Sequence, residues 1–382
     1  MMRFIPCACR TSLLVSICAL GALIFTADAA GQRDRRPGIE ASPVLRQSIA
    51  DAAKKYKIPG IAAALIEHGQ LRAVEVFGVR DQKSNAPVTP STIFEAGSLG
   101  EPAYAYAVLL LAADGRFNPG APLPSYLPLP YVRDLDLTSP SPATESLYDP
   151  RFNQITAIRV MNHTSGMPAW ANNRHLRLEA EPGTKWSYSN EGYLYLQQVV
   201  EHATGESFQD FVARSVLGPA RMSRSSFVWQ ETNSSDIATG YGRSGAPVEV
   251  QRYSRPAATA TLYTTIEDYA RFVMRLLASA PAQRAHESAV SLMLNPTIAI
   301  DTANSFSWGL GLGLEKTGDD LFFFQSGSNP GFQSFVLASR KTGNGIVVFT
   351  NSANGLDAAP DLIAATLGGN HPIVKSPFLH SQ

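Results

Sequence analysis

Apolar positions along the chain change their spacing several times, and each spacing predicts a different kind of element. Over residues 42–56, apolar side chains recur every three or four positions after an initial serine, which predicts a capped amphipathic helix. Two apolar runs, 61–67 and 71–78, flank His68 and Gly69 and predict a β-hairpin. The folded part of the chain is therefore expected to begin with one helix and two strands.

The segment 92–115 places a small polar residue in front of a strongly apolar helix. A short apolar run ends at Gly97, Ser98 follows, and the helix beyond has almost no polar face. Such a helix is expected to be buried all round, with Ser98 at its N-terminal tip. Unpaired backbone N–H groups and the positive end of the helix dipole gather at this tip, so it suits a nucleophile or an oxyanion.

The rest of the chain changes from helical spacing to strand spacing. Further helices are predicted at 156–162, 191–204, 207–216, 265–277 and 360–367. The period then falls to two, which predicts antiparallel strands at 308–314, 321–326, 333–339 and 345–351. We expect one domain over 42–370 with an α/β (α+β) fold, in which helices flank an antiparallel sheet built from the N- and C-terminal segments. A helical subdomain is expected at roughly 100–280, with the active cleft between it and the sheet.

The first 29 residues have the pattern of a secretory signal peptide. Arg3 and Arg10 precede an apolar stretch over 13–25, and residues 27–29 are small enough for cleavage. An uncleaved anchor is the alternative, although the apolar stretch is short for a membrane span. Residues 30–41 are polar and are expected to be disordered. We expect an exported protein, periplasmic or secreted, with no membrane span after signal cleavage.

Composition excludes several classes of function. The chain has 32 basic and 32 acidic residues, and this balance gives no electrostatic footprint for nucleic acid. Cys7, Cys9 and Cys18 are its only cysteines and lie in the predicted signal peptide, so the mature chain would have neither a disulfide nor a cysteine metal site. The seven histidines show no H-x-x-x-H or H-x-H spacing, and we expect no metal or other cofactor.

Five stretches of the sequence carry a family resemblance, and in chain order they are FEAGSLGEPAYAYAVLLLAADG, NHTSGMPAW, EPGTKWSYSNEGYLYL, ATLYTTIEDYARF and QSGSNPGFQSFVLASRKTGNGIVVFTNS. Together they resemble the serine β-lactamase-like family, which includes class C β-lactamases, D-alanyl-D-alanine carboxypeptidases, D-aminopeptidases and related esterases. The resemblance covers roughly residues 40–356 and implies three motifs. In S-x-x-K the serine is acylated and the lysine helps to take its proton. In Y-x-N the tyrosine carries protons and the asparagine contacts the substrate, and K/H-x-G on a strand binds the acyl group.

The first and third of these motifs are altered in this chain. The three read Ser98-Leu99-Gly100-Glu101, Tyr188-Ser189-Asn190 and Gln325-Ser326-Gly327. Glutamate therefore replaces the lysine of the first motif, and glutamine replaces the lysine or histidine of the third. Two Lys-Thr-Gly triplets, 316–318 and 341–343, are predicted to lie in turns between strands rather than to form the third motif. The resemblance accordingly assigns acyl binding to Gln325, Gly327 and the following Ser328.

Glutamate at position 101 has two interpretations. Ser-x-x-Glu at a helix start is a capping box, in which Ser98 and Glu101 would only stabilise the helix terminus. Alternatively, Glu101 replaces the lysine as base, which requires burial to raise its pKa. Its charge would then oppose an oxyanion at roughly 5 Å by about 3 kcal/mol, for an effective dielectric constant of about 20. We expect slow or absent turnover, with Tyr188 as the main proton carrier.

The sequence is consistent with two functions. The first is an exported serine hydrolase that acts through acyl-Ser98 on a small ester, amide or peptide, with Asn190 and Gln325 contacting the substrate. The resemblance places the oxyanion against the backbone N–H groups of Ser98 and Ser328, and the missing cationic residues argue against penicillins and D-Ala-D-Ala peptides. The second function is a catalytically inactive relative that binds a peptide, glycan or protein partner through the same cleft. His163 lies in a turn that the family shares and is expected to be structural.

Overall fold

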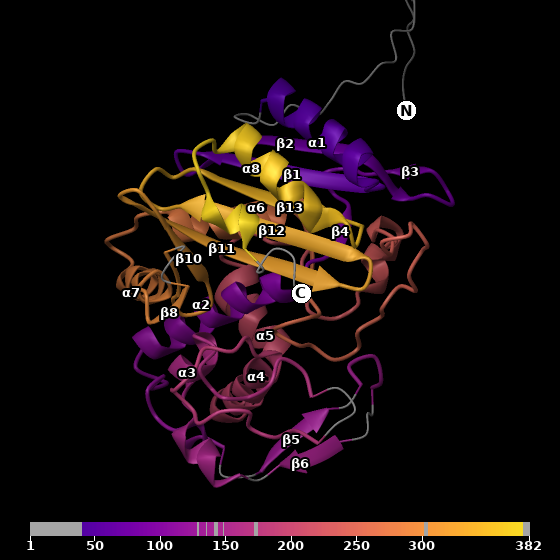
Figure 1. Cartoon of the computed structure of the whole chain (residues 1–382). Coiled ribbons are helices and arrows are strands. Elements are labelled where there is room, and N and C mark those ends of the chain that lie inside the picture. Colours follow the sequence, from indigo (N-terminus) through magenta and orange to yellow (C-terminus); the bar gives the residue numbers. More distant parts are fainter. Residues whose placement is uncertain are drawn as a thin grey trace, which may run out of the picture. The chain divides into compact units, whose positions relative to one another are not determined.

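Figure 1 shows the computed structural model, which describes residues 40–376 apart from 128–129, 135, 141–143, 148, 172–174 and 302–304. The predicted signal peptide and nearly all of the polar segment 30–41 lie outside the described residues. The described residues belong to one compact unit.

One antiparallel sheet of nine strands runs through the described part of the chain (Figure 1). Its strands are β1 (Gly60–Glu67), β2 (Gln70–Asp81), β3 (Ala86–Pro87), β8 (Ile298–Asp301), β9 (Phe306–Trp308), β10 (Gly313–Thr317), β11 (Asp320–Asn329), β12 (Phe332–Ser339) and β13 (Gly345–Thr350). Their order is β3-β2-β1-β13-β12-β11-β10-β9-β8, so β1 pairs with β13 from the other end of the chain. This confirms the predicted fold.

Helices and two small sheets surround the large sheet. The helices are α1 (Pro43–Tyr56), α2 (Gly100–Ala113), α3 (Ala157–Met161), α4 (Asn190–Thr204), α5 (Phe208–Val212), α6 (Ile266–Leu277), α7 (Arg284–Met293) and α8 (Ala359–Thr366). The small sheets pair β4 (Ile93–Glu95) with β7 (Tyr263–Thr265) and β5 (Tyr131–Asp134) with β6 (Thr144–Leu147). In the ranges that the structure describes, no helix is both long and apolar enough to cross a bilayer.

The two faces of the large sheet bury different apolar clusters. Ile61 and Ala63 of β1 belong to a cluster with α1 and α8, whereas Ala62 and Ala64 belong to a cluster with α2 and α6. Successive side chains of a strand point to opposite faces, so an almost continuous apolar run is what a sheet covered on both sides requires. The helix α2 lies within the second cluster and is buried along nearly its whole length, as its sequence predicts.

Three sequence predictions of elements need correction. The strand predicted at 308–314 is two strands, β9 and β10, joined by a turn in which the backbone N–H of Gly309 donates to the carbonyl of Leu312 (2.9 Å). The strand predicted at 321–326 continues to Asn329 as β11. The helix predicted at 207–216 is α5 followed by a π-helical turn, Ala213–Leu217. Alternating glycines imitate the strand period, which explains the first error.

Candidate active site

Ser98 lies in a tight turn directly before α2. Residues Gly97–Leu99 form one 3-10 turn, and Ser98 is 7% exposed. The residue at the N-cap of α2 is Leu99, and no side chain caps either the 3-10 turn or α2. The capping-box interpretation of Ser98 and Glu101 is therefore wrong, because the serine oxygen caps nothing and the glutamate side chain points elsewhere.

Two glycines allow β11 to approach this turn closely. Gly97 has a φ of +55°, and a Cβ atom there would lie 2.8 Å from the backbone N of Ser328. A Cβ atom on Gly327 would lie 2.0 Å from the carbonyl oxygen of Ala96. Any side chain at either position would push the strand away, so both glycines are needed to bring the backbone N of Ser328 beside the Ser98 turn.

The second motif lies at the start of α4. The hydroxyl of Ser189 accepts a hydrogen bond from the backbone N–H of Gly192 (3.0 Å) and donates to the carbonyl of Pro168 (2.9 Å), which makes Ser189 the N-cap of α4. Asn190 is the first residue of the helix. Its amide lies between two partners, donating from Nδ2 to Glu101 Oε1 (3.3 Å) and accepting on Oδ1 from Trp170 Nε1 (2.7 Å).

The Glu101 carboxylate lies at the centre of the site and is fully buried. Gln325 Nε2 donates to Glu101 Oε2 (3.1 Å) and to Tyr188 Oη (3.4 Å). Asn190 donates to the other carboxylate oxygen, as described above. Among the described residues, the only basic side chain within 4 Å of this carboxylate is His163, whose Nε2 is 3.6 Å from Oε2. No lysine among the described residues lies within 4 Å of the Glu101 carboxylate, so none replaces the lysine that the first motif lacks.

Burial and charge shift the acidities of Glu101 and Tyr188 in the same direction. Burial raises the pKa of the Glu101 carboxyl, and contacts with His163, Tyr188 and Gln325 lower it by less. The pKa of the Tyr188 hydroxyl is raised well above its usual value, first by burial and then by the Glu101 charge, while a hydrogen bond with Ser98 lowers it. A free phenolate is thus disfavoured, and both Ser98 and Glu101 influence the pKa of the Tyr188 hydroxyl.

The structure places the sequence-predicted site residues together. Ser98, Glu101, Tyr188, Asn190, Gln325, Gly327 and Ser328 come from the Ser98 turn, the first turn of α2, the start of α4 and the strand β11. The Lys-Thr-Gly triplets lie elsewhere. The first comprises the last two residues of β10, Lys316 and Thr317, and Gly318 of the turn that follows, so its prediction as a turn was only partly right. The other lies in the turn from β12 to β13, where Lys341 forms an ion pair with Asp319 (2.5 Å).

Sequence reasoning missed two buried titratable groups beside the site. His163, expected to be structural, faces Glu101. Glu95 is the last residue of β4 and accepts a hydrogen bond from Asn329 Nδ2 (2.8 Å). Burial raises the pKa of the Glu95 carboxyl to about 7, although hydrogen bonds from Asn329 and from the backbone of Gln251 lower it in part. An acid within an apolar run was a visible signal for Glu95, whereas only the tertiary structure shows that His163 lies beside Glu101.

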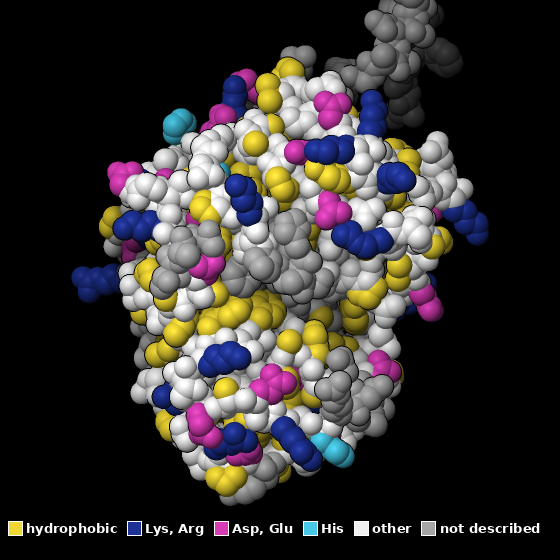
Figure 2. Space-filling model, viewed as in Figure 1, with side chains coloured by type: hydrophobic (Ala, Val, Ile, Leu, Met, Phe, Trp, Pro, Cys, Tyr) yellow, Lys and Arg dark blue, Asp and Glu magenta, His cyan; other side chains and the backbone are white. Residues whose placement is uncertain are grey.

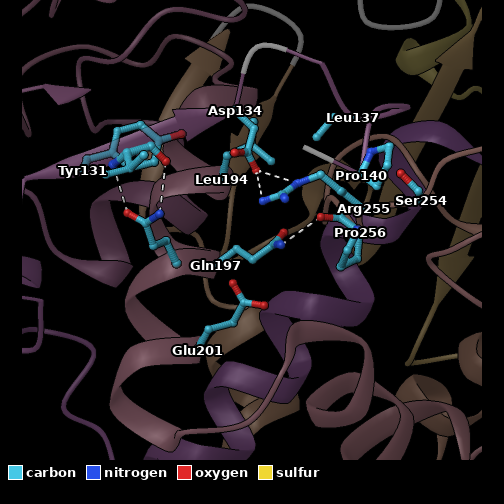
Figure 3. Close-up of a pocket in the computed structure, with 12 residues that line it drawn as sticks. Tyr131, Asp134, Leu137, Pro140, Leu194, Gln197, Glu201, Ser254, Arg255 and Pro256 are labelled. Atoms are coloured by element: carbon cyan, nitrogen blue, oxygen red, sulfur yellow. Dashed lines mark hydrogen bonds and ion pairs between the residues drawn. The ribbon is translucent and has the colours of Figure 1, made fainter. Parts of the chain in front are cut away.

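Hollows on the surface extend beyond these residues. Figure 2 shows hydrophobic side chains gathered across the middle of one face, between the sheet and the helices α3 and α4. Figure 3 shows a hollow of about 360 Å³ along α4, where Leu194, Gln197 and Glu201 face the ion pair of Arg255 with Asp134 (2.5 Å). None of the seven site residues lines this hollow. Over the described ranges, no group of three or more His, Cys, Asp or Glu side chains could hold a metal ion.

Comparison with known proteins agrees with the geometry. The model of the family described as "Beta-lactamase" matches residues 45–369. "Protein flp" of Staphylococcus aureus (strain MRSA252) is 25% identical over 321 residues, which is 78% of this chain and 60% of that protein. A "Beta-lactamase" of Pseudomonas fluorescens is 23% identical over 243 residues, 60% of this chain and 63% of that protein. The chain thus spans less than two thirds of the length of these relatives.

Solved structures show the same fold. A class C β-lactamase mutant superposes with a TM-score of 0.72 at 18% identity, covering 85% of this chain and 96% of that one. The D-alanine carboxypeptidase AmpC of Burkholderia cenocepacia gives a TM-score of 0.69 at 19% identity, covering 84% and 98%. An octameric penicillin-binding protein homologue of Pyrococcus abyssi gives 0.70 at 21% identity, covering 88% and 79%.

Proposed function

The chain belongs to the β-lactamase family, and from this premise we propose that it is an exported serine hydrolase in which Glu101 replaces a lysine as the final proton acceptor. The observation that carries the proposal is the position of the Tyr188 hydroxyl, because Gln325 Nε2 donates both to it (3.4 Å) and to the Glu101 carboxylate (3.1 Å). The pKa of this hydroxyl also depends on both Ser98 and Glu101. A buried carboxyl with a raised pKa is a more useful base near neutral pH than an ordinary glutamate.

Protons move along this line in the proposed reaction. Ser98 Oγ attacks the substrate carbonyl carbon, its proton passes to Tyr188 Oη, and the proton of Tyr188 passes to the Glu101 carboxylate. Tyr188 never becomes a free phenolate, which its raised pKa disfavours. Glu101 gains a proton as the oxyanion forms and is then neutral. The repulsion of about 3 kcal/mol expected between two negative charges therefore does not arise.

The later steps use the same groups. The oxyanion is stabilised by the backbone N–H groups of Ser98 and Ser328, which the glycines at 97 and 327 allow to lie close together. Collapse breaks the bond to the leaving group, which takes its proton back from Tyr188 while Glu101 returns one to the tyrosine. Water then attacks the acyl-serine along the same path, so an ester and water become an acid and an alcohol, and an amide and water an acid and an amine.

The substrate is proposed to be an uncharged ester, amide or peptide end. Glu101 and Gln325 stand where the family motifs have cationic residues, and His163 is the one described basic side chain within 4 Å of Glu101. A substrate carboxylate would find no cation there, and repulsion from Glu101 would select against it. Asn190 and Gln325 supply amide groups for hydrogen bonds to a neutral acyl group.

A fluorophosphonate probe read by intact mass tests the proposal. The wild-type protein is expected to gain one adduct, and Ser98→Ala to gain none. Glu101→Gln keeps the size of the side chain and removes the base, so we expect acylation to slow by about a hundred- to ten-thousand-fold. If the negative charge were only a hindrance to the oxyanion, the same substitution would accelerate the reaction.

Two outcomes would overturn the proposal. A faster Glu101→Gln variant would remove the carboxylate from the proton path. A folded wild-type protein that gains no adduct from the probe, and hydrolyses no aryl ester, would favour the second function, binding of a peptide, glycan or protein partner without turnover.

A further inference from the structure

His163 is held against the second motif by two backbone contacts. It follows α3, is fully buried and has a φ of +56°, a left-handed conformation that costs energy for any residue except glycine. Its carbonyl accepts from the backbone N–H of Ser187 (2.8 Å), and its Nδ1 accepts from the backbone N–H of Ser189 (3.1 Å). Its ring lies against the ring of Tyr188, with centroids 4.2 Å apart. The position of this imidazole is therefore set by the segment that carries Tyr188.

The contact with Ser189 determines which ring nitrogen carries the proton. A nitrogen that accepts a hydrogen bond has no proton of its own, so in the neutral ring the proton is on Nε2. Nε2 is buried and has no hydrogen-bond partner among the described residues. The charged atom beside it is Glu101 Oε2, at 3.6 Å. This distance is too long for a hydrogen bond and close enough for strong electrostatic coupling between two fully buried groups.

Several other groups face the Glu101 carboxylate. They are Tyr188 before α4, Asn190 and Tyr193 on α4, Gln325 on β11 and Tyr269 on α6. The three tyrosines have pKa values raised by burial and by the charge of Glu101, so they are neutral near pH 7. Within the described ranges, His163 is thus the one basic side chain beside this carboxylate.

We propose that His163 is a positioning residue that keeps Glu101 ionised next to Tyr188 through its Nε2–H, and so sets the pH above which Glu101 accepts the tyrosine proton. The inference rests on the proposed function, in which Glu101 is that acceptor. His163 neither takes nor gives a proton in the proposed reaction and acts through Glu101. A carboxylate buried with two amide donors and no lysine needs a further source of positive potential, and the imidazole N–H provides it.

Two substitutions of His163 separate this role from a structural one. His163→Gln retains a donor near the place of Nε2 and loses the acceptor for Ser189, whereas His163→Asn retains the acceptor and loses the donor. Both are uncharged. We expect His163→Asn to shift the acidic limb of the pH profile of kcat/KM upwards by about one pH unit, so that acylation below that limb slows about tenfold, and His163→Gln to stay near the wild-type profile.

Each result of this comparison is decisive. If His163 only held Ser189 in place, His163→Asn would keep the wild-type profile and His163→Gln would lose rate at every pH. That pattern, or two unchanged profiles, would overturn the inference. Should either variant fail to fold, the wild-type protein supplies a test: ¹⁵N NMR is expected to show the proton of His163 on Nε2, and a proton on Nδ1 would overturn the inference.

A measurement without turnover separates failure of this inference from failure of the proposed function. Infrared titration of Ser98→Ala protein follows the protonated Glu101 carboxyl, identified as the band lost in Ser98→Ala/Glu101→Gln. Adding His163→Asn to Ser98→Ala is expected to raise the midpoint pH of this titration. Adding His163→Gln is expected to leave the midpoint pH close to that of Ser98→Ala alone. If His163→Asn left the midpoint unchanged, the role of His163 would be overturned even if the wild-type protein were a fully active enzyme. If His163→Asn raised the midpoint but the wild-type protein showed no activity, only the proposed hydrolase function would be overturned.

Discussion

Two buried carboxyl groups, Glu95 and Glu101, lie three residues to either side of Ser98. Each accepts a hydrogen bond from an amide on β11, Glu95 from Asn329 (2.8 Å) and Glu101 from Gln325 (3.1 Å). Burial raises the pKa of both carboxyl groups. The strand that is proposed to bind the acyl group is therefore tied to the Ser98 turn by two contacts that change with protonation.

The stability of the protein should reflect the titration of Glu95. The pKa of its carboxyl is 4.5 in the absence of burial and about 7 in the folded protein. The folded state holds this proton more tightly, so the stability that Glu95 contributes is complete below pH 4.5 and is lost as the pH rises to about 7. The loss is at most about 3 kcal/mol.

We therefore expect Glu95→Gln to be more stable than the wild-type protein at about pH 8, with a flatter dependence of unfolding free energy on pH. Urea unfolding at about pH 5 and about pH 8 measures this. The exposed Glu249 supplies a matched control, Glu249→Gln, whose pH dependence should equal that of the wild type. A Glu95→Gln variant with the wild-type pH dependence would show that the folded Glu95 titrates normally.

At the scale of elements, the N-terminus of α4 connects helix formation to the site. The N-cap Ser189 lies between Tyr188 and Asn190, and its hydroxyl joins Gly192 to Pro168. The same residue donates its backbone N–H to His163. Ser189, the central residue of the second motif, thus orients both α4 and the imidazole of His163 behind Tyr188. A residue that can cap a helix suits this position for that reason.

Removing this cap should affect the site as well as the stability. Ser189→Ala is expected to lower the unfolding free energy by about 1–2 kcal/mol, because the hydroxyl caps α4 and also binds Pro168. Ser42→Ala removes the cap of α1, away from the site, and should cost about 1 kcal/mol with unchanged kinetics. Denaturant unfolding gives the stability of both variants, and ester hydrolysis gives their kcat/KM. If kcat/KM were the same in Ser189→Ala as in Ser42→Ala, the cap of α4 would have no part in catalysis.

At the scale of the whole molecule, the sheet joins the two ends of the folded chain. Phe349 of β13 lies opposite Ala62 of β1, and its ring centroid is 5.8 Å from that of Phe94 and 5.8 Å from that of Tyr269. These partners lie far apart in the sequence, and Phe94 belongs to the β4 strand that leads to Ser98. Packing of the sheet and placement of the nucleophile therefore depend on the same cluster.

Truncation at this point should destabilise the entire fold. Phe349→Ala leaves a large cavity among fully buried neighbours and is expected to cost about 3–5 kcal/mol. Leu292→Ala removes a side chain that is 39% exposed and should cost less than about 1 kcal/mol. Urea unfolding of each variant, followed by both fluorescence and circular dichroism, provides the measurement. A loss below about 1 kcal/mol for Phe349→Ala would show that the ends of the sheet are not coupled.

Much of the architecture was predictable because local spacing and tertiary burial agree. The continuous apolar runs of β1 and β13 are typical of strands that are covered on both faces, and both strands are buried almost throughout. The capped amphipathic pattern of α1 and α6 indicates which face of each helix is buried. The helix α7 and the two small sheets were not predicted, since short apolar stretches are consistent with several kinds of element. The alternating glycines after Trp308 imitated a strand and in fact form a turn.

The sequence by itself determined the family, the antiparallel sheet from both ends of the chain and the candidate site residues, because these follow from periodicity and from motifs that are contiguous in the chain. Only the tertiary structure decided what Glu101 does: it directs its carboxylate to Tyr188, Gln325 and Asn190 rather than to the helix terminus. It likewise brought His163 against that carboxylate. The physical reason is that protonation and hydrogen bonding of a buried group depend on neighbours from four separate segments, and no local pattern in the chain records which of them meet.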